Sequence, residues 1–276
     1  MQLASRFART ATVLRADIPL RDEQIQAVAP SIFAPAKHVS RSERYTYIPT
    51  IDLLQGLRKE GFMPFMVCQS RTRDDAKRDH TKHMLRLRHA GQIGEREANE
   101  IILLNSHDGT SSYQMLAGVF RFVCKNGLVC GNTLSDIRIA HKGNIKENVI
   151  EGAFRVLEDF GQVTEAKEGM QALTLRTAEQ EIFARAALAL KYDVSSTGAL
   201  PISEAQVLQP KRVEDMRDDL WTTFNRTQEN LVSGGQRGRS ANGSRITTRP
   251  VTAIDQNIKL NRALWILAQE MQKLKG

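Results

Sequence analysis

The sequence has few of the features that mark membrane and secreted proteins. It holds three cysteines in 276 residues and contains no run of eighteen apolar residues. Charged residues interrupt every apolar stretch near the start of the chain, so no secretory signal is recognisable. These absences argue against a membrane-spanning helix and against a disulfide scaffold. We therefore expect a cytoplasmic protein whose reduced thiols, Cys68, Cys124 and Cys130, pack in its core.

Glycine motifs that bind nucleotides are also missing. No P-loop and no dinucleotide-binding fingerprint occurs. The stretch GGQRGRSANG is rich in glycine, but no predicted strand precedes it and no Lys-Ser or Lys-Thr pair follows it. Carboxylates do not gather in a pattern typical of nucleases. We accordingly expect no cofactor and no bound metal, and the sequence favours a binding protein over an enzyme.

Positive charge is present in excess and is unevenly distributed. The formal net charge is +8, and the isoelectric point is about 9.6. From Arg226 to Gly276 the chain holds nine basic and only three acidic residues. A basic region of this kind is typical of proteins that bind polyanions, and it predicts a nucleic-acid partner.

Hydrophobic periodicity predicts an α+β protein, with an antiparallel β-rich N-terminal half and a helical C-terminal half. Pro64, inside a predicted strand, suggests an edge or a bulge. Asn126-Gly127 lies between two β-rich runs and predicts a hairpin near residues 119–131, in which Cys124 and Cys130 would face each other. Two further helices are expected over residues 213–231 and 253–274. The expected segments are a helical and loop region at 1–40, a β-rich core at 41–145, and a helical region at 146–276 with a basic Gly-rich loop at 233–250.

The loop NLVSGGQRGRSANGSRITTRP, residues 230–250, is the strongest candidate for a binding site. Its arginines can each bind two phosphate oxygens, and its glycines allow backbone amides to approach a phosphate. A flexible connection between two helices is the alternative. Trp221 and Trp265 lie near the two ends of the loop, either as core anchors or as platforms for stacked bases. The residues predicted to contact nucleic acid are Arg226, Arg237, Arg239, Arg245, Arg249, Lys259 and Arg262.

A second candidate is the segment NSHDG, residues 105–109, which directly follows an apolar strand. His107 and Asp108 could do general acid–base work or hold a metal. The alternative is an Asx-turn, with Asp108 and Gly109 setting its geometry. His80 and His83 could also share a metal, but the basic residues around them favour a solvated turn.

Three blocks of the sequence resemble the phage/plasmid-like protein family. They are SRSERYTYIPT, NSHDGTSSYQMLAGVFRFVCKNGLVCG and LWTTFNRTQENLVSGGQRGR…TTRPVTAIDQNIKLNRALW, and together they extend from about Ser40 to Leu274. The resemblance implies a protein of prophages or conjugative plasmids in the bacterial cytoplasm, and it implies no activity. The order of predicted elements is also similar to the core of single-strand annealing recombinases, which form rings or filaments on single-stranded DNA without ATP.

These observations lead to one expectation and two alternatives. We expect a homo-oligomeric nucleic-acid-binding protein that binds or anneals single-stranded DNA in recombination or plasmid maintenance. The first alternative is a metal-assisted hydrolase centred on NSHDG. The second is a non-enzymatic protein that binds a host factor.

Overall fold

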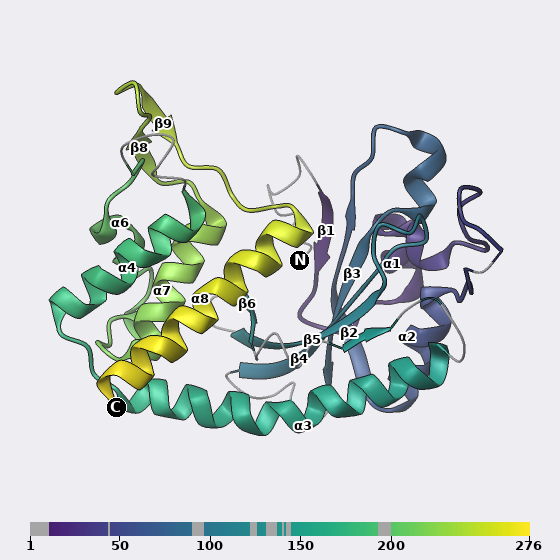
Figure 1. The fold of residues 1–276 in the computed structure, drawn as a ribbon, viewed down its shortest axis with the longest axis horizontal. Helices are drawn as coiled ribbons and strands as arrows, with labels where there is room; N and C mark the ends of the chain where they lie inside the picture. Colours follow the sequence, from purple (N-terminus) through teal and green to yellow (C-terminus); the bar gives the residue numbers. More distant parts are fainter. Residues whose placement is uncertain are drawn as a thin grey trace. The chain divides into compact units, whose positions relative to one another are not determined.

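The computed structural model describes residues 11–43, 45–89, 97–121, 126–130, 137–139, 141, 145–192 and 200–276. The chain divides into two compact units. Unit 1 comprises residues 1–161 and 252–254, and unit 2 comprises residues 162–251 and 255–276. The boundary falls at Gly161, inside one long helix, α3 (Ile145–Ala172). Strands lie mainly in the first half of the chain and helices in the second, so the predicted α+β class is confirmed (Figure 1).

Unit 1 is built on an antiparallel sheet of seven strands. The strands are β1 (Ala11–Arg15), β2 (Phe62–Ser70), β3 (His83–His89), β4 (Glu97–Asn105), β5 (Tyr113–Arg121), β6 (Asn126–Val129) and β7 (Ile137–Ile139). They pair in the order β1 to β6, and β7 pairs with the first residues of β5. The helical elements of unit 1 are α1 (Asp22–Val28), the 3-10 turns η1 (Pro30–Phe33) and η2 (Asp75–His80), α2 (Thr50–Lys59), and the first half of α3.

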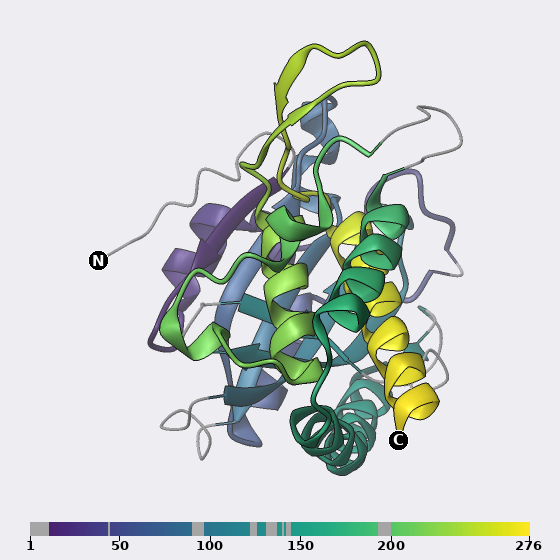
Figure 2. The same cartoon turned by 90° about the vertical axis from the view of Figure 1, so that its left-hand side faces the viewer.

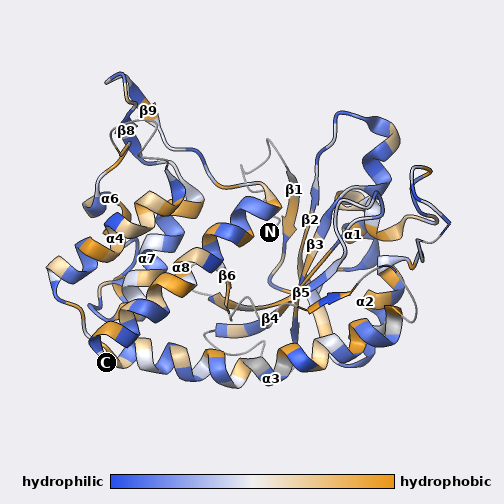
Figure 3. Ribbon diagram, viewed as in Figure 1, coloured by the Kyte–Doolittle hydropathy of each residue, from blue (hydrophilic) through white to orange (hydrophobic). Residues whose placement is uncertain are grey.

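One face of the sheet forms the main hydrophobic core. Val67, Leu85, Leu103 and Met115 are opposite one another on four adjacent strands and are completely buried. Apolar side chains of α1, α2 and α3 belong to the same core cluster. Figure 3 shows the apolar content of the strands. The predicted bulge at Pro64 is confirmed, because the β2–β3 register shifts between Pro64 and Met66.

The predicted hairpin near residues 119–131 is confirmed as the pairing of β5 with β6, but its turn was placed wrongly. Asn126 pairs with Arg121 and Gly127 with Phe120, so both residues belong to β6 rather than to the turn. The guanidinium of Arg86 lies where a Cβ of Gly127 would be, at 2.2 Å, so this glycine serves close packing. Cys68 and Cys130 are buried free thiols, and burial raises the pKa of Cys68 to about 12. Cys124 lies outside the described residues.

Unit 2 is a small group of helices that carries a short two-stranded sheet. Its elements are the second half of α3, α4 (Thr177–Lys191), α6 (Glu204–Leu208), the 3-10 turn η5 (Val213–Asp215), α7 (Leu220–Ser233), β8 (Arg237–Arg239), β9 (Arg245–Thr247) and α8 (Ile254–Lys275). Trp221 and Trp265 pack edge to face with ring centroids 6.5 Å apart, and both are almost fully buried. The two tryptophans are therefore core anchors and not stacking platforms. Within the described part of the chain, no helix is long and apolar enough to span a membrane.

Candidate nucleic-acid interface

The basic Gly-rich loop forms a β-ribbon that projects from the helices of unit 2 (Figures 1 and 2). We call β8, β9 and the turn between them, residues 237–247, the basic ribbon. Backbone hydrogen bonds join the two chain segments at the base of the ribbon. The amide of Gly235 donates to the carbonyl of Thr248 at 2.8 Å, and the amide of Val251 donates to the carbonyl of Val232 at 2.9 Å. The ribbon is also fixed to the segment before α6, because the amide of Arg239 donates to the carbonyl of Pro201 at 3.0 Å. Hydrogen bonds within unit 2 thus give the loop a defined shape.

Glycine is required at two positions of this loop by close contacts within the protein. Gly234 ends α7 with a φ of 62°, and a Cβ there would lie 2.6 Å from the carbonyl carbon of Arg249. At Gly238 a Cβ would lie 2.0 Å from the carbonyl oxygen of Pro201. The backbone amides of Gly234, Gly235 and Gly243 all donate to carbonyl oxygens of the loop or of α7. These three glycine amides are therefore occupied and are not available to a phosphate.

The two faces of the basic ribbon differ in character. Arg239 pairs with Arg245 in the β8–β9 register, so the two side chains project from the same face. Arg237 lies two residues before Arg239 and shares that face. Gly238 and Ile246 occupy the opposite face. Gly238 packs there against Pro201 and Ile202, whereas Ile246 stays partly exposed. One face of the ribbon is thus cationic, and the other is apolar.

The arginines of this loop lack acidic partners. Arg237, Arg239, Arg245 and Arg249 are exposed, and in the part of the chain that the structure describes none of their guanidinium groups forms an ion pair. The side chain of Arg239 makes one long hydrogen bond, 3.3 Å, to the carbonyl of Gly243. Figure 3 shows the ribbon as predominantly hydrophilic. Like charges directly opposite each other destabilise a strand pair, so Arg239 and Arg245 favour an external anion between them.

The other three predicted contact residues lie in different surroundings. Arg226 is only 7% exposed, and its guanidinium donates to the Gln180 side chain at 2.8 Å. Arg226 therefore holds α7 to α4 and is not part of the exposed surface. Lys259 is exposed on α8, whereas Arg262 on the same helix is half-buried and has interactions within the protein.

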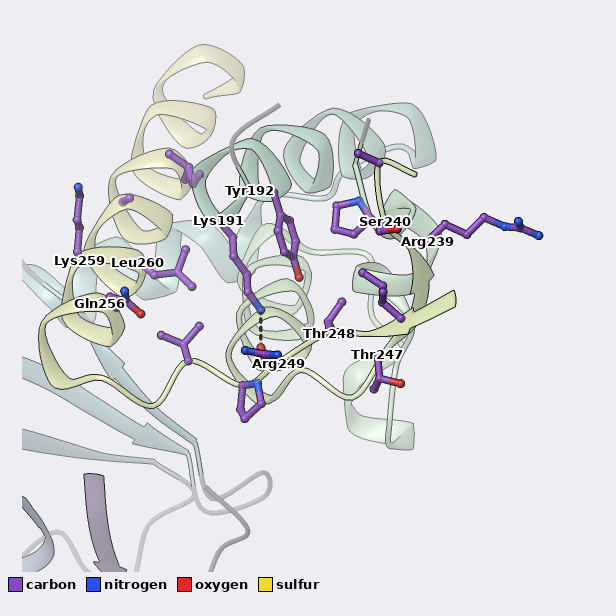
Figure 4. Close-up of a pocket in the computed structure, with 17 residues that line it drawn as sticks. Lys191, Tyr192, Arg239, Ser240, Thr247, Thr248, Arg249, Gln256, Lys259 and Leu260 are labelled. Atoms are coloured by element: carbon purple, nitrogen blue, oxygen red, sulfur yellow. Dashed lines mark hydrogen bonds between the residues drawn. The ribbon is translucent and has the colours of Figure 1, made fainter. Parts of the chain in front are cut away.

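A pocket of about 1020 Å³ lies beside the basic ribbon, between the end of α4, the ribbon and the start of α8 (Figure 4). Lys191 joins these parts. Its ammonium donates to the carbonyl of Leu231 at 2.5 Å and to the carbonyl of Arg249 at 3.2 Å, so it ties together the two ends of the loop. Burial lowers the pKa of Lys191 to about 8. Among the described residues, none that lines the pocket is acidic.

Sequence reasoning missed the pocket because its walls come from distant segments. Lys191 and Tyr192 end α4, more than forty residues before the basic ribbon. In the sequence Lys191 closes an amphipathic helix and has no distinguishing neighbour. The only signal available was the tendency of lysine near a helix C-terminus to cap carbonyls, and that tendency does not identify the helix that is capped.

In unit 1, the segment NSHDG takes the conformation of the Asx-turn alternative. The Asp108 carboxylate accepts hydrogen bonds from the amide and the hydroxyl of Thr110, at 3.0 and 2.6 Å. Gly109 adopts a φ of 80°. His107 is completely buried, and burial together with three neighbouring histidines holds its pKa far below the usual range. A histidine in this position is closed to solvent and is not placed to exchange protons with a substrate.

His107 belongs to a buried polar network centred on the hydroxyl of Thr50, in the first turn of α2. This oxygen lies 2.9 Å from His83 Nε2 and 3.2 Å from His107 Nε2, and it accepts a hydrogen bond from the Asn105 amide at 3.1 Å. His83 also contacts the hydroxyl of Ser31 at 2.8 Å, and burial lowers its pKa to about 4. Across the residues that are described, no group of three or more His, Cys, Asp or Glu is arranged to hold a metal ion. The expected solvated turn is wrong for His83, which is buried at the start of β3 with its two ring nitrogens near the hydroxyls of Ser31 and Thr50.

Comparison with known proteins gives the family of the chain. Residues 37–265 match the domain of unknown function DUF932. Two proteins of Escherichia coli (strain K12), the UPF0380 proteins YafZ and YfjQ, are each 53% identical to the chain over 270 residues, which covers 98% of this chain and 97% of theirs. No solved structure matches it. Because the match spans both units, the chain belongs to the DUF932 family.

Proposed function

We propose that this protein binds nucleic acid through the basic ribbon of unit 2, with single-stranded DNA as the favoured form. The observation that carries the proposal is the cationic face of the ribbon. Arg237, Arg239 and Arg245 project from one face of a fixed β-ribbon, and no acidic side chain among the described residues neutralises them. Phosphate groups spaced along a strand supply the charge that this face lacks.

The remaining features of the loop support phosphate binding by side chains. Arg249 is exposed at the base of the ribbon, and Lys259 is exposed on α8 at the edge of the same pocket. The hydroxyls of Ser240 and Thr247 can add neutral donors. Since the amides of Gly234, Gly235 and Gly243 are occupied, affinity would come mainly from guanidinium and ammonium groups and would therefore fall steeply with salt.

For the wider biological role of the protein, we propose the one that the sequence predicted. This role is that of a homo-oligomeric, cytoplasmic protein of a mobile element, which binds or anneals single-stranded DNA in recombination or plasmid maintenance. The fixed basic surface and the lack of a P-loop in the sequence support it. A hydrolase centred on His107 and Asp108 is not supported, because His107 is buried and the Asp108 carboxylate is used by Thr110. A protein partner that covers the ribbon is the competing proposal.

The test compares two matched double variants for binding of a labelled 30-nucleotide single strand at low salt. Arg237→Ala/Arg239→Ala removes two unpaired guanidinium groups from the ribbon. Arg155→Ala/Arg217→Ala removes the same charge from exposed side chains that pair with Glu151 and Asp219. We expect a loss of affinity of at least about tenfold for the first and less than about threefold for the second. Equal affinities would show that the ribbon does not bind DNA, and co-purification of a host protein that the first variant loses would favour the competing proposal.

A further inference from the structure

The pocket beside the basic ribbon has an apolar wall and cations at its sides. Two of its large apolar side chains are partly exposed, Leu190 at 48% and Ile246 at 36%. The ring of Tyr192 extends from the end of α4 into the same space (Figure 4). Apolar surface held open in this way, inside a concave site, is suited to a flat apolar group.

Cationic side chains lie on opposite sides of this pocket. In Figure 4, Lys259 stands on α8 at one side, and Arg239 extends away from the pocket at the other. The ammonium of Lys191 is used by two carbonyl groups and lies 5.2 Å from the centroid of the Tyr192 ring. A ligand that fits would therefore have an apolar part inside the pocket and negative charges on both sides of it.

We propose that the pocket receives a nucleobase from the strand whose phosphates lie on the basic ribbon. This inference rests on the proposed function. A nucleotide within a strand has a flat apolar base and a phosphate on each side, which matches the apolar wall of the pocket and the cations at its two sides. Bases stack on aromatic rings in proteins that bind single strands, and such stacking is tolerant of sequence. The hydroxyl of Thr248 is used within the protein, because it accepts a hydrogen bond from the amide of Gln236 at 3.0 Å, so the pocket would hold a base by stacking and apolar contact.

The pocket would thereby select single strands. A base in a duplex is paired and stacked and can enter a pocket only if it is flipped out, which costs a few kcal/mol. A single strand can turn a base outward at a much lower cost. The ribbon would then account for the electrostatic part of binding, and the pocket for the preference between strand forms.

The experiment uses the full chain and three labelled probes of equal length: a thymine single strand, a fully abasic single strand with the same phosphates, and a duplex. Ile246→Ala shortens an exposed side chain in the pocket, and Tyr192→Ala removes the ring. Val213→Ala is the matched control, because Val213 is 77% exposed in unit 2 and does not line the pocket. Circular dichroism shows whether each variant is folded. If Tyr192→Ala does not fold, Ile246→Ala alone tests the proposal.

We expect wild type to bind the thymine strand about tenfold more tightly than the abasic strand, and Ile246→Ala or Tyr192→Ala to reduce that ratio at least threefold. Affinity for the abasic strand and the duplex should stay unchanged in both variants, and Val213→Ala should behave as wild type. Equal wild-type affinities for thymine and abasic strands, or a ratio unchanged in Ile246→Ala, would overturn the base pocket while leaving the ribbon intact. If wild type binds none of the probes at low salt, the proposed function itself fails.

Discussion

The polar network around Thr50 in unit 1 and the basic ribbon in unit 2 are both rich in polar side chains. The polar groups of the network bind one another, whereas those of the ribbon face solvent. In unit 1, the Thr50 hydroxyl alone has four neighbours within hydrogen-bonding range, from His83, Asn105, His107 and Tyr113. In unit 2, the arginines of the ribbon face solvent without acidic partners in the described chain. The number of hydrogen-bond or ion-pair partners within the protein thus distinguishes polar side chains that stabilise the fold from polar side chains that are available to a ligand.

The same contrast appears between the two sets of arginines. Arg86 and Arg88 in β3 are almost fully buried, and both pair with Glu100, at 2.7 and 2.8 Å. The guanidinium of Arg88 also lies over the ring of Phe120, 3.6 Å from its centroid. These arginines are parts of the interior of unit 1. Among the described residues, the ribbon arginines have no equivalent of Glu100. The comparison predicts that substitutions in the two sets affect different measurements.

The largest effect on stability is expected for Glu100→Gln. The change leaves two buried guanidinium groups without a carboxylate, which costs about 3–5 kcal/mol. Urea unfolding followed by circular dichroism measures it. Glu151→Gln breaks an exposed ion pair with Arg155 and should cost less than about 1 kcal/mol. Similar losses in the two variants would show that the buried pairs do not stabilise unit 1.

Acid should destabilise unit 1 through its histidines. The folded-state pKa of His83 is about 4, against about 6.5 in the unfolded chain. Between these values the unfolded state binds more protons, so stability is complete above about pH 6.5 and is lost as the pH falls towards 4. His83 alone contributes about 3 kcal/mol to this loss. Urea midpoints at pH 7.5, 6 and 5 measure it. A urea midpoint that is the same at pH 7.5 and at pH 5 would contradict the burial of these histidines.

A smaller loss is expected for Thr50→Val, which keeps the shape of the side chain and removes the shared hydroxyl. His83, Asn105 and His107 would each lose a buried partner, and we expect a cost of about 1–3 kcal/mol. Thr247→Val makes the same change on the exposed ribbon and should leave the unfolding midpoint unchanged. Equal midpoints for the two variants would remove the distinction between the two regions.

The smallest effect on stability is expected within the ribbon. Arg245→Ala removes one of two like charges that oppose each other across β8 and β9, so stability should stay within about 0.5 kcal/mol of wild type or rise slightly. Thermal unfolding with and without single-stranded DNA measures this. We expect DNA to raise the midpoint of wild type more than that of the variant. A clear destabilisation of the free protein would indicate that Arg245 has a structural role.

Much of the fold could be predicted from the sequence because its signals are local. The helix expected at 253–274 is α8 (Ile254–Lys275), and Leu85 and Leu87 lie on the core face of β3, as alternation predicts. The pair Asn126-Gly127 led to a wrong position for the hairpin turn, because Gly127 is required by its close contact with Arg86 and not by a turn. Long-range contacts have no local signal. The burial of Arg226 against Gln180 and the capping of α7 by Lys191 depend on segments about forty residues apart, so the sequence indicated the ribbon but not the pocket.

The salt dependence of single-strand binding tests the central claim most directly. Each phosphate contact on a single strand contributes about 0.7 to the slope of log K against log salt concentration. If the basic ribbon binds phosphates, the slope for Arg237→Ala/Arg239→Ala should be shallower than that of wild type by about 1.4, and Arg155→Ala/Arg217→Ala should keep the wild-type slope. The same slope for all three proteins would contradict the claim, because it would place the phosphates elsewhere on the molecule.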